Sequence, residues 1–220
     1  MLAVRALSVV LVLALAACGS PSAGWSAPRP APSPVGRLDP GFLGPSGTPS
    51  PEGTVTPSPG SWDGVHPAPG YRVVLLTAGS DAPTRALVAA VQDWAAAEHV
   101  DLRTVTAAGH DDLVPAVTRA LGLHGDLIVT AGNDLVDPLA VVTASHLDQP
   151  FLVVGAELAE PTANVTAVDW AGASYRGEGL GMSSTYDESS FTPARCSAAV
   201  RAGAAAVLTG LTGIVVWLRD

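Results

Sequence analysis

The chain contains no lysine, and its 220 residues hold only 11 arginines against 20 acidic side chains. The formal net charge is −9, and the arginines are scattered along the chain instead of being clustered. Proteins that bind nucleic acid neutralise phosphates with a concentrated basic surface. The composition therefore argues against a nucleic acid partner.

Sequence signatures of catalysis are also missing. There is no Gly-x-Ser-x-Gly nucleophile elbow, no P-loop and no Gly-x-Gly-x-x-Gly after a predicted strand. The five histidines have no histidine or cysteine partner at metal-ligand spacing, so we expect no metal site. We therefore predict a protein that is not an enzyme and needs no cofactor.

The amino-terminal residues resemble a bacterial lipoprotein signal. Arg5 supplies a positive charge, residues 6–14 are apolar, and the sequence Leu15-Ala16-Ala17-Cys18 closes the leader with small residues before a cysteine. This resemblance implies that residues 1–17 are a signal peptide and that Cys18 is lipidated. The protein would then be anchored through its lipid to the outer face of the bacterial plasma membrane, in the cell envelope.

Only one other cysteine, Cys196, occurs in the chain. With Cys18 lipidated, no intramolecular disulfide can form. We expect Cys196 to be a small buried side chain at the start of a helix, with a reactive thiol as the alternative.

Proline dominates the segment after the leader, since residues 19–70 hold 13 of the 19 prolines together with many Gly and Ser residues. Such a composition buries little apolar surface, which predicts a disordered tether over residues 18–70. At about 3.1 Å per residue in polyproline II, the tether would reach on the order of 150 Å.

From Tyr71 onward, apolar runs alternate with helical patterns. This alternation predicts an α/β domain over residues 71–220, with a parallel β-sheet and helices on both faces. Residues 171–195 are polar and rich in Gly and Ser, so they form an insertion in this pattern. The strands are predicted at 72–77, 102–106, 126–130, 150–154, 164–169 and 213–218, and the helices from Pro83 and at 111–121, 135–146 and 196–208.

The end of the chain allows a second interpretation. Residues 202–218 contain no charge and are just long enough to span a membrane. Three glycines and the break at residues 209–213 favour a helix followed by a strand instead. If 213–218 is a terminal strand, its apolar edge must be paired in the sheet or drive formation of a homodimer, and Trp217 should be at least partly buried.

Four motifs follow one another in the domain: Asp126-Leu-Ile-Val-Thr-Ala-Gly-Asn133, Phe151-Leu-Val-Val-Gly-Ala-Glu157, Asn164-Val-Thr-Ala-Val-Asp169 and Ala199-Val-Arg-Ala-Gly-Ala-Ala-Ala-Val-Leu-Thr-Gly-Leu-Thr-Gly-Ile-Val-Val216. In this order they resemble the BMP (basic membrane protein) family of ABC-transporter substrate-binding lipoproteins. The resemblance covers residues 72–218 and implies a type I periplasmic-binding fold that binds nucleosides or similar small solutes between two lobes. We expect a single lobe here.

The chain departs from the family in its first turn. The family carries an Asp-x-Ser-Phe-Asn element there, whose aromatic ring can stack on a base. Here the turn is Gly79-Ser-Asp-Ala-Pro-Thr-Arg85, which keeps an acidic residue and has no aromatic one. The insertion at residues 171–195 is a second departure, because family members pass directly into the following helix.

Candidate ligand-binding residues follow the predicted strands, because ligands of open α/β sheets bind beyond the carboxyl ends of the strands. Glycine lets the backbone approach a ligand, and Asn and carboxylates can hydrogen-bond sugar hydroxyls. The same residue types are common as turn and helix-capping residues, which is the alternative for each of them. The candidates are Gly79, Ser80, Asp81, Gly132, Asn133, Asp134, Gly155 and Glu157, with Trp170 as an apolar platform.

These features predict a membrane-anchored solute-binding lipoprotein of an ABC-type uptake system. Its partners would be a small polar solute, with a nucleoside as one candidate, and an ABC permease or another envelope protein. The alternative is an envelope protein-interaction or sensory lipoprotein that keeps the fold without a role in transport. The long segment before the domain and the 171–195 insertion support this alternative.

Overall fold

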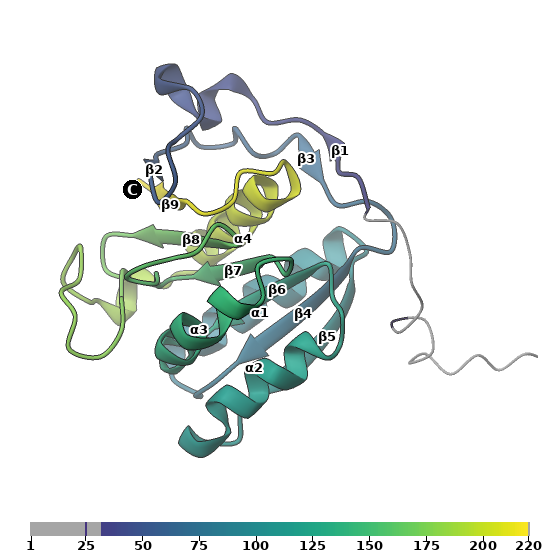
Figure 1. Cartoon of the computed structure of the whole chain (residues 1–220). Coiled ribbons are helices and arrows are strands. Elements are labelled where there is room, and N and C mark those ends of the chain that lie inside the picture. Colours follow the sequence, from purple (N-terminus) through teal and green to yellow (C-terminus); the bar gives the residue numbers. More distant parts are fainter. Residues whose placement is uncertain (1–24, 26–31, 220) are drawn as a thin grey trace, which may run out of the picture.

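The computed structural model describes Trp25 and residues 32–219 (Figure 1). The predicted leader at residues 1–17 and the predicted lipidation of Cys18 lie outside the described residues.

A seven-stranded, entirely parallel β-sheet forms the centre of the protein, in the order β2-β9-β8-β7-β6-β4-β5 (Figure 1). The predicted α/β class with a parallel sheet is confirmed. The six predicted strands appear within two residues of their expected bounds. The strands of this sheet are β2 (Thr54–Val55), β4 (Arg72–Thr77), β5 (Asp101–Thr106), β6 (Leu127–Ala131), β7 (Phe151–Val154), β8 (Val165–Trp170) and β9 (Val215–Leu218).

Helices cover both faces of the sheet, as predicted. On one face α1 and α4 pack against side chains such as Leu75 and Leu152, and on the other α2 and α3 pack against Leu76 and Ile128. Because successive side chains of a strand point to opposite faces, a strand with two covered faces must be apolar throughout. The helices are α1 (Ala82–Ala97), α2 (Leu113–Leu121), α3 (Val136–Val142) and α4 (Pro193–Leu208).

Helix bounds differ from the prediction where a cap or a tighter turn intervenes. α4 begins three residues earlier than expected, because the Thr192 hydroxyl accepts a hydrogen bond from Arg195 N and Pro193 occupies the first turn. The predicted helix over 135–146 is shorter in the structure, because α3 passes into a 3-10 turn after Val142.

Short 3-10 turns occur in the loops and at helix ends of the described residues. They are η1 (Pro40–Phe42), η2 (Gly44–Ser46), η3 (His110–Asp112), η4 (Asn133–Leu135), η5 (Thr143–Ser145) and η6 (Glu188–Ser190).

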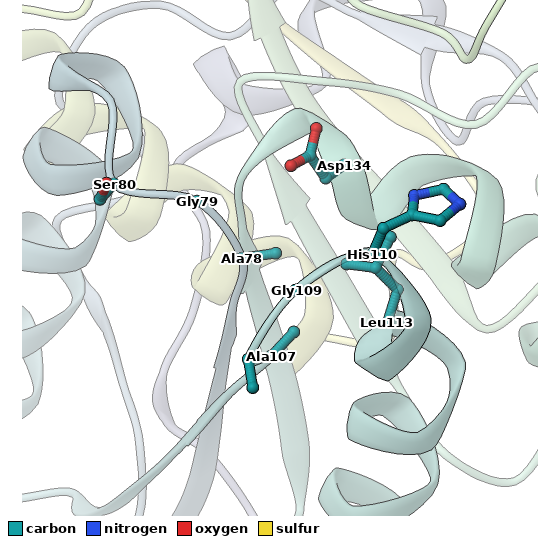
Figure 2. Close-up of a pocket in the computed structure, with 9 residues that line it drawn as sticks. Ala78, Gly79, Ser80, Ala107, Gly109, His110, Leu113 and Asp134 are labelled. Carbon is teal, nitrogen blue, oxygen red and sulfur yellow. The ribbon is translucent and has the colours of Figure 1, made fainter.

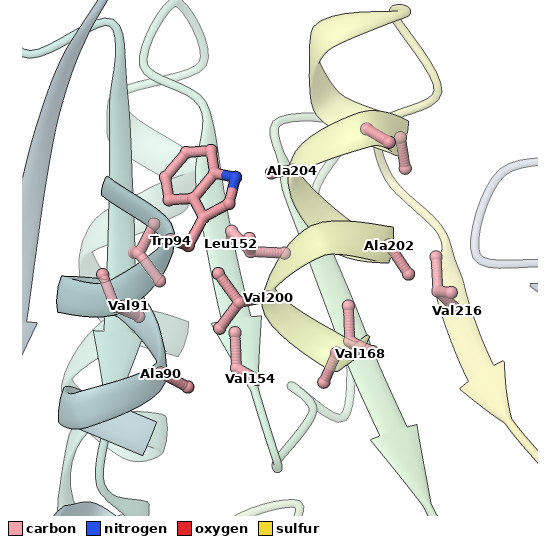
Figure 3. Packing of buried hydrophobic residues seen from close by; sticks show 14 of the residues in the cluster. Ala90, Val91, Trp94, Leu152, Val154, Val168, Val200, Ala202, Ala204 and Val216 are labelled. Atoms are coloured by element: carbon pink, nitrogen blue, oxygen red, sulfur yellow. The ribbon is translucent and has the colours of Figure 1, made fainter. Parts of the chain in front are cut away.

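Small residues let α4 lie close to the sheet (Figure 3). A Cβ atom at Gly203 would lie 2.5 Å from Leu152 Cδ1 and 2.6 Å from Val168 Cγ2, so any larger residue at this point of the helix would displace these core side chains. Cys196, in the first turn of α4, is fully buried. Burial raises the pKa of its thiol to about 11, and the expectation of a small buried side chain at the start of a helix is confirmed.

Residues 32–70, which we call the belt, correct the prediction of a disordered tether for this part of the chain. The belt runs over α4 to the far edge of the sheet (Figure 1). Phe42 is fully buried in the main core, and Val55, Trp62 and Val65 are less than a tenth exposed. Isolated apolar residues among the prolines thus bury enough surface to order the segment.

Backbone pairing and side-chain contacts hold the belt in place. β2 pairs in parallel with β9, and Glu52 N donates to Gly213 O at 2.7 Å. β1 (Val35–Gly36) and β3 (Val65–His66) form a small antiparallel sheet within the belt. Near the carboxyl end of the belt, Asp63 pairs with Arg201 of α4, and His66 Nδ1 lies 2.9 Å from Glu98 Oε2.

The terminal strand is paired on both sides. β9 lies between β8 and β2, and Trp217 is partly buried, as predicted. Because β2 pairs with the outer edge of β9, this edge is not exposed, and the argument that it must drive formation of a homodimer does not apply. The interpretation of residues 202–218 as a membrane span is wrong, since they are divided between the end of α4, a turn and β9. Among the described residues, none of the helices has the length and apolarity to cross a membrane.

We predict that the belt contributes a large part of the stability. Phe42→Ala should lower the free energy of unfolding by about 3–5 kcal/mol, because a fully buried aromatic side chain is lost from the core. Val35→Ala, in the same segment but with Val35 53% exposed, is the matched control and should change it little. Denaturant titration of the leaderless chain measures both, and equal midpoints for the two variants would show that the belt is not part of the cooperative unit.

Candidate functional site

The carboxyl ends of β4, β5 and β6 meet at one edge of the sheet. β4 lies between β5 and β6, so the chain turns to opposite sides of β4 in succession, which creates a switch point in strand order. Crevices at such points are where ligands of open α/β sheets bind. The strands end here in turns whose backbones cross-link, with Ala78 N donating to Ala131 O at 3.2 Å and Ala107 N donating to Thr77 O at 2.9 Å.

A hollow of about 420 Å³ opens between these turns (Figure 2). Ala78 and Gly79 form part of its lining, and Figure 2 shows Ala78 and Gly109 between Ser80 on one side and His110 on the other. Asp134 lines it from the turn after β6. We call this space the switch-point hollow.

A second hollow, of about 400 Å³, shares His110 and Asp134 with the first and continues between α2 and α3. Its walls include Val141 of α3 and Tyr175 from the segment after β8. We call it the side groove. Because the two hollows share lining residues, a bound solute could extend from one into the other.

The two hollows are electrostatically negative. Asp134 is exposed and, within the described part of the chain, its carboxylate makes no hydrogen bond or ion pair. Asp137 accepts a hydrogen bond from Glu178 N at 3.2 Å, and neither hollow has an arginine in its lining. Burial, followed by the charges of Asp137, Glu178 and Asp134, raises the pKa of Tyr175 above its ordinary value. The site therefore favours neutral or cationic groups over anions.

Three of the predicted residues, Gly79, Ser80 and Asp134, line the switch-point hollow. Asp81, Gly132 and Asn133 lie around a smaller neighbouring hollow of about 190 Å³. The Asp81 carboxylate accepts hydrogen bonds from Thr84 N at 2.9 Å and Thr84 Oγ1 at 2.8 Å, which caps α1. Partial burial by itself would raise the pKa of Asp81, but these hydrogen bonds hold that pKa below its ordinary value.

Gly132 has a structural reason of its own. Its φ is 119°, and a Cβ atom there would overlap the carbonyl oxygen of Ala78 where the turns after β4 and β6 cross. This close approach brings Asp134 beside the turn of Gly79 and so shapes the hollow.

The structure places Gly155, Glu157 and Trp170 away from both hollows, which corrects their prediction as ligand-binding residues. Trp170 is fully buried, packs edge-on against Phe191 at 5.0 Å, and donates from Nε1 to Ser190 Oγ at 3.0 Å. A Cβ atom at Gly155 would lie 2.7 Å from Phe191 Cε1. All three residues therefore serve to hold the 171–195 segment.

Glu157 is the polar part of this attachment. Its Oε1 accepts a hydrogen bond from Ser183 Oγ at 3.0 Å and lies 3.0 Å from Arg176 Nε. Glu157 N donates to Tyr175 O at 2.8 Å, so a backbone hydrogen bond also joins the residues after β7 to the 171–195 segment.

His110 and Tyr175 were not among the predicted site residues. His110 follows β5 as Gly79 follows β4, so the same strand-end argument applied to the turn after residue 106 would have found it. Tyr175 has no such signal, because its position depends on how the 171–195 segment folds back toward α3.

Asp169, the next-to-last residue of β8, is a fully buried carboxyl group. Its Oδ1 accepts hydrogen bonds from Ser174 N at 2.6 Å and Trp170 N at 3.0 Å, whereas Oδ2 has no partner among the described residues. Burial, opposed by these two hydrogen bonds and reinforced by the charge of Glu157, raises the pKa of Asp169 to about 7.

This raised pKa makes stability depend on pH. The folded protein keeps the Asp169 proton over a range in which the unfolded chain, with an ordinary pKa of about 4, has lost it. The Asp169 contribution to the free energy of unfolding is therefore highest below about pH 4 and falls as pH rises through about 7, by at most about 1.4 kcal/mol per unit.

We predict that Asp169→Asn removes this fall, because an amide stays neutral throughout. The exposed Asp187, in the same segment, is the control, since Asp187→Asn should keep the wild-type pH dependence between pH 5 and 8. Urea unfolding at several pH values measures the difference, and parallel curves for wild type and Asp169→Asn would refute the assignment.

Among the described residues, no three His, Cys, Asp or Glu side chains come together in a way that could hold a metal ion.

Comparison with protein-family models and with curated protein sequences gives no match. Solved structures do show likeness. An ABC transporter solute-binding protein from Aeropyrum pernix K1 is 20% identical with a TM-score of 0.42, over 46% of this chain and 29% of its own. A periplasmic ribose ABC transporter protein from Conexibacter woesei DSM 14684 is 16% identical with a TM-score of 0.34, over 70% and 56%.

A transcriptional activator of the comK gene from Bacillus halodurans is also similar, 14% identical with a TM-score of 0.39, over 46% of this chain and 35% of its own. The chain thus spans about a third of the length of the Aeropyrum pernix protein and about half of the length of the Conexibacter woesei protein.

Proposed function

We propose that the chain is a membrane-anchored extracytoplasmic solute-binding lipoprotein of an ABC-type uptake system, similar to the BMP family, and that it binds a ligand without catalysing a reaction. The observation that carries the proposal is the switch-point hollow, which lies where open α/β sheets bind their ligands. The leader with Leu15-Ala16-Ala17-Cys18 supports anchoring at the outer face of the membrane.

The ligand is a small polar solute without phosphate. A volume of about 420 Å³ falls within the range of small-molecule sites, roughly 300–1,000 Å³. Backbone groups of Gly79 and Gly109 can approach a ligand closely, and the Asp134 carboxylate can accept hydrogen bonds from hydroxyl or amino groups. A nucleoside fits this description, whereas a nucleotide would bring its negative charges toward Asp134, Asp137 and Glu178.

We predict weak but selective binding by the leaderless chain. Calorimetric titration should give dissociation constants of roughly millimolar size for nucleosides, because an open hollow buries only part of a ligand, and weaker binding for the matching nucleotides. Asp134→Asn should weaken nucleoside binding about tenfold through loss of a charged acceptor. Asp93→Asn, at an exposed site on α1, is the control.

Two results would contradict this prediction. One is that no nucleoside or other uncharged solute binds at millimolar concentration. The other is that Asp134→Asn and Asp93→Asn behave alike, which would place any binding outside the switch-point hollow.

A second function, an envelope protein-interaction or sensory lipoprotein, is favoured by the apolar rim of the side groove. Val141 is 73% exposed and Val114 is 45% exposed, on facing helices. Cross-linking in intact membranes distinguishes the two functions. Capture of an ABC permease favours transport, whereas capture of a sensor or wall protein that Val141→Glu abolishes favours this second function.

A further inference from the structure

Trp25 is docked at the edge of the sheet opposite the switch-point hollow. It is only 3% exposed and packs with the core on the α2 and α3 face. Its contacts are to Arg72, the first residue of β4, and to Asp101 and Arg103 at the start of β5.

Three kinds of contact hold this side chain. The indole Nε1 donates to Asp101 Oδ2 at 2.6 Å, a charge-assisted hydrogen bond. The Arg103 guanidinium lies 4.3 Å from the ring centroid and that of Arg72 lies 5.8 Å from it, both within the range of cation–π attraction. Arg72 Nη1 also donates to the carbonyl oxygen of Trp25 at 3.0 Å. Both the backbone and the side chain of Trp25 are therefore bound to the start of β4 and β5.

The position of this contact along the strands is decisive. Trp25 binds at the amino ends of β4 and β5, whereas the switch-point hollow opens beyond their carboxyl ends at Thr77 and Thr106. Each strand has six residues, so the two places are separated by roughly 20 Å of sheet.

Trp25 is also only seven residues from Cys18. Seven residues span at most about 25 Å even when fully extended, far less than the reach of a free tether over residues 18–70. A docked Trp25 therefore limits how far the domain can move from whatever holds Cys18.

We propose that Trp25 fixes the amino-terminal segment to the amino edge of the sheet and thereby orients the domain on the membrane. The amino edge faces the lipid surface at short range, and the switch-point hollow faces away from it. The orientation rests on the proposed lipidation of Cys18, whereas the docking of Trp25 does not.

The docking is tested on the leaderless, unlipidated chain by hydrogen exchange. Trp25→Ala should increase exchange of amides in peptides spanning residues 20–30 and at the start of β5 by about tenfold or more, through loss of the hydrogen bond and both cation–π contacts. Trp25→Phe, which keeps a ring but no N–H donor, should give an intermediate value. Ser80→Ala, at the opposite edge, is the control, and exchange in Trp25→Ala equal to this control would overturn the proposal.

The orientation is tested on the lipidated chain in vesicles that carry an acceptor dye. A donor dye is attached at Asp148→Cys, at the amino edge, or at Ser80→Cys, at the carboxyl edge, since Cys196 is buried. Energy transfer should be clearly stronger from position 148 than from position 80, and Trp25→Ala should reduce this difference. Equal transfer from both positions in the otherwise unchanged chain would overturn the orientation.

These two experiments also separate the proposals. A chain that is not lipidated at Cys18 would not attach to vesicles, and the orientation would then fail together with the lipoprotein function. The exchange experiment would still decide the docking, and solute titration would still decide whether the switch-point hollow binds a ligand.

Discussion

A parallel sheet with apolar side chains on both faces must be covered on both faces and protected at its edges. In this protein α1 with α4 and α2 with α3 cover the faces, and the belt completes the cover at β9. The rest of the structure follows from that requirement. Glycine at position 203 lets α4 come close to the sheet, and the hollow lies beyond the carboxyl ends of β4, β5 and β6.

The same requirement explains what could be predicted from the sequence. Strand and helix patterns are local, so the alternation after Tyr71 gave the sheet and most element bounds. Val55 and Val216 pair in the sheet although most of the chain lies between them in the sequence. No repeating apolar pattern in residues 32–70 predicts this pairing. Single apolar residues such as Phe42 and Trp62, set among prolines, do not form the repeating pattern that identifies a buried element.

The site shows the same limit. Gly79, Ser80 and Asp134 were found because the turns after parallel strands necessarily meet at one edge. Gly155 and Trp170 also lie at the carboxyl ends of strands, but they pack close to Phe191 instead of lining the hollow. Phe191 belongs to a segment whose path the strand pattern does not determine. Strand-end position is thus a good guide to where a hollow lies, and a poor guide to which side chains remain open to it.

Charge distribution gives the hollow its character. With no lysine in the chain, arginine alone balances the carboxylates, and two arginines are engaged elsewhere: Arg201 pairs with Asp63, and Arg119 pairs with Asp112. The hydrogen bond from Arg119 lowers the pKa of Asp112 to about 2. Asp134 has no such partner among the described residues, so its carboxylate is the charged acceptor that the lining of the hollow offers to a solute.

The buried thiol of Cys196 has a practical consequence. Once Cys18 carries lipid or is replaced by serine, a thiol-directed reagent can react only with Cys196, and only when the first turn of α4 opens. The rate of modification then reports how often this part of the helix opens, without any label having to be introduced. The protein thus carries its own kinetic probe of opening, in the first turn of the helix that packs against the sheet.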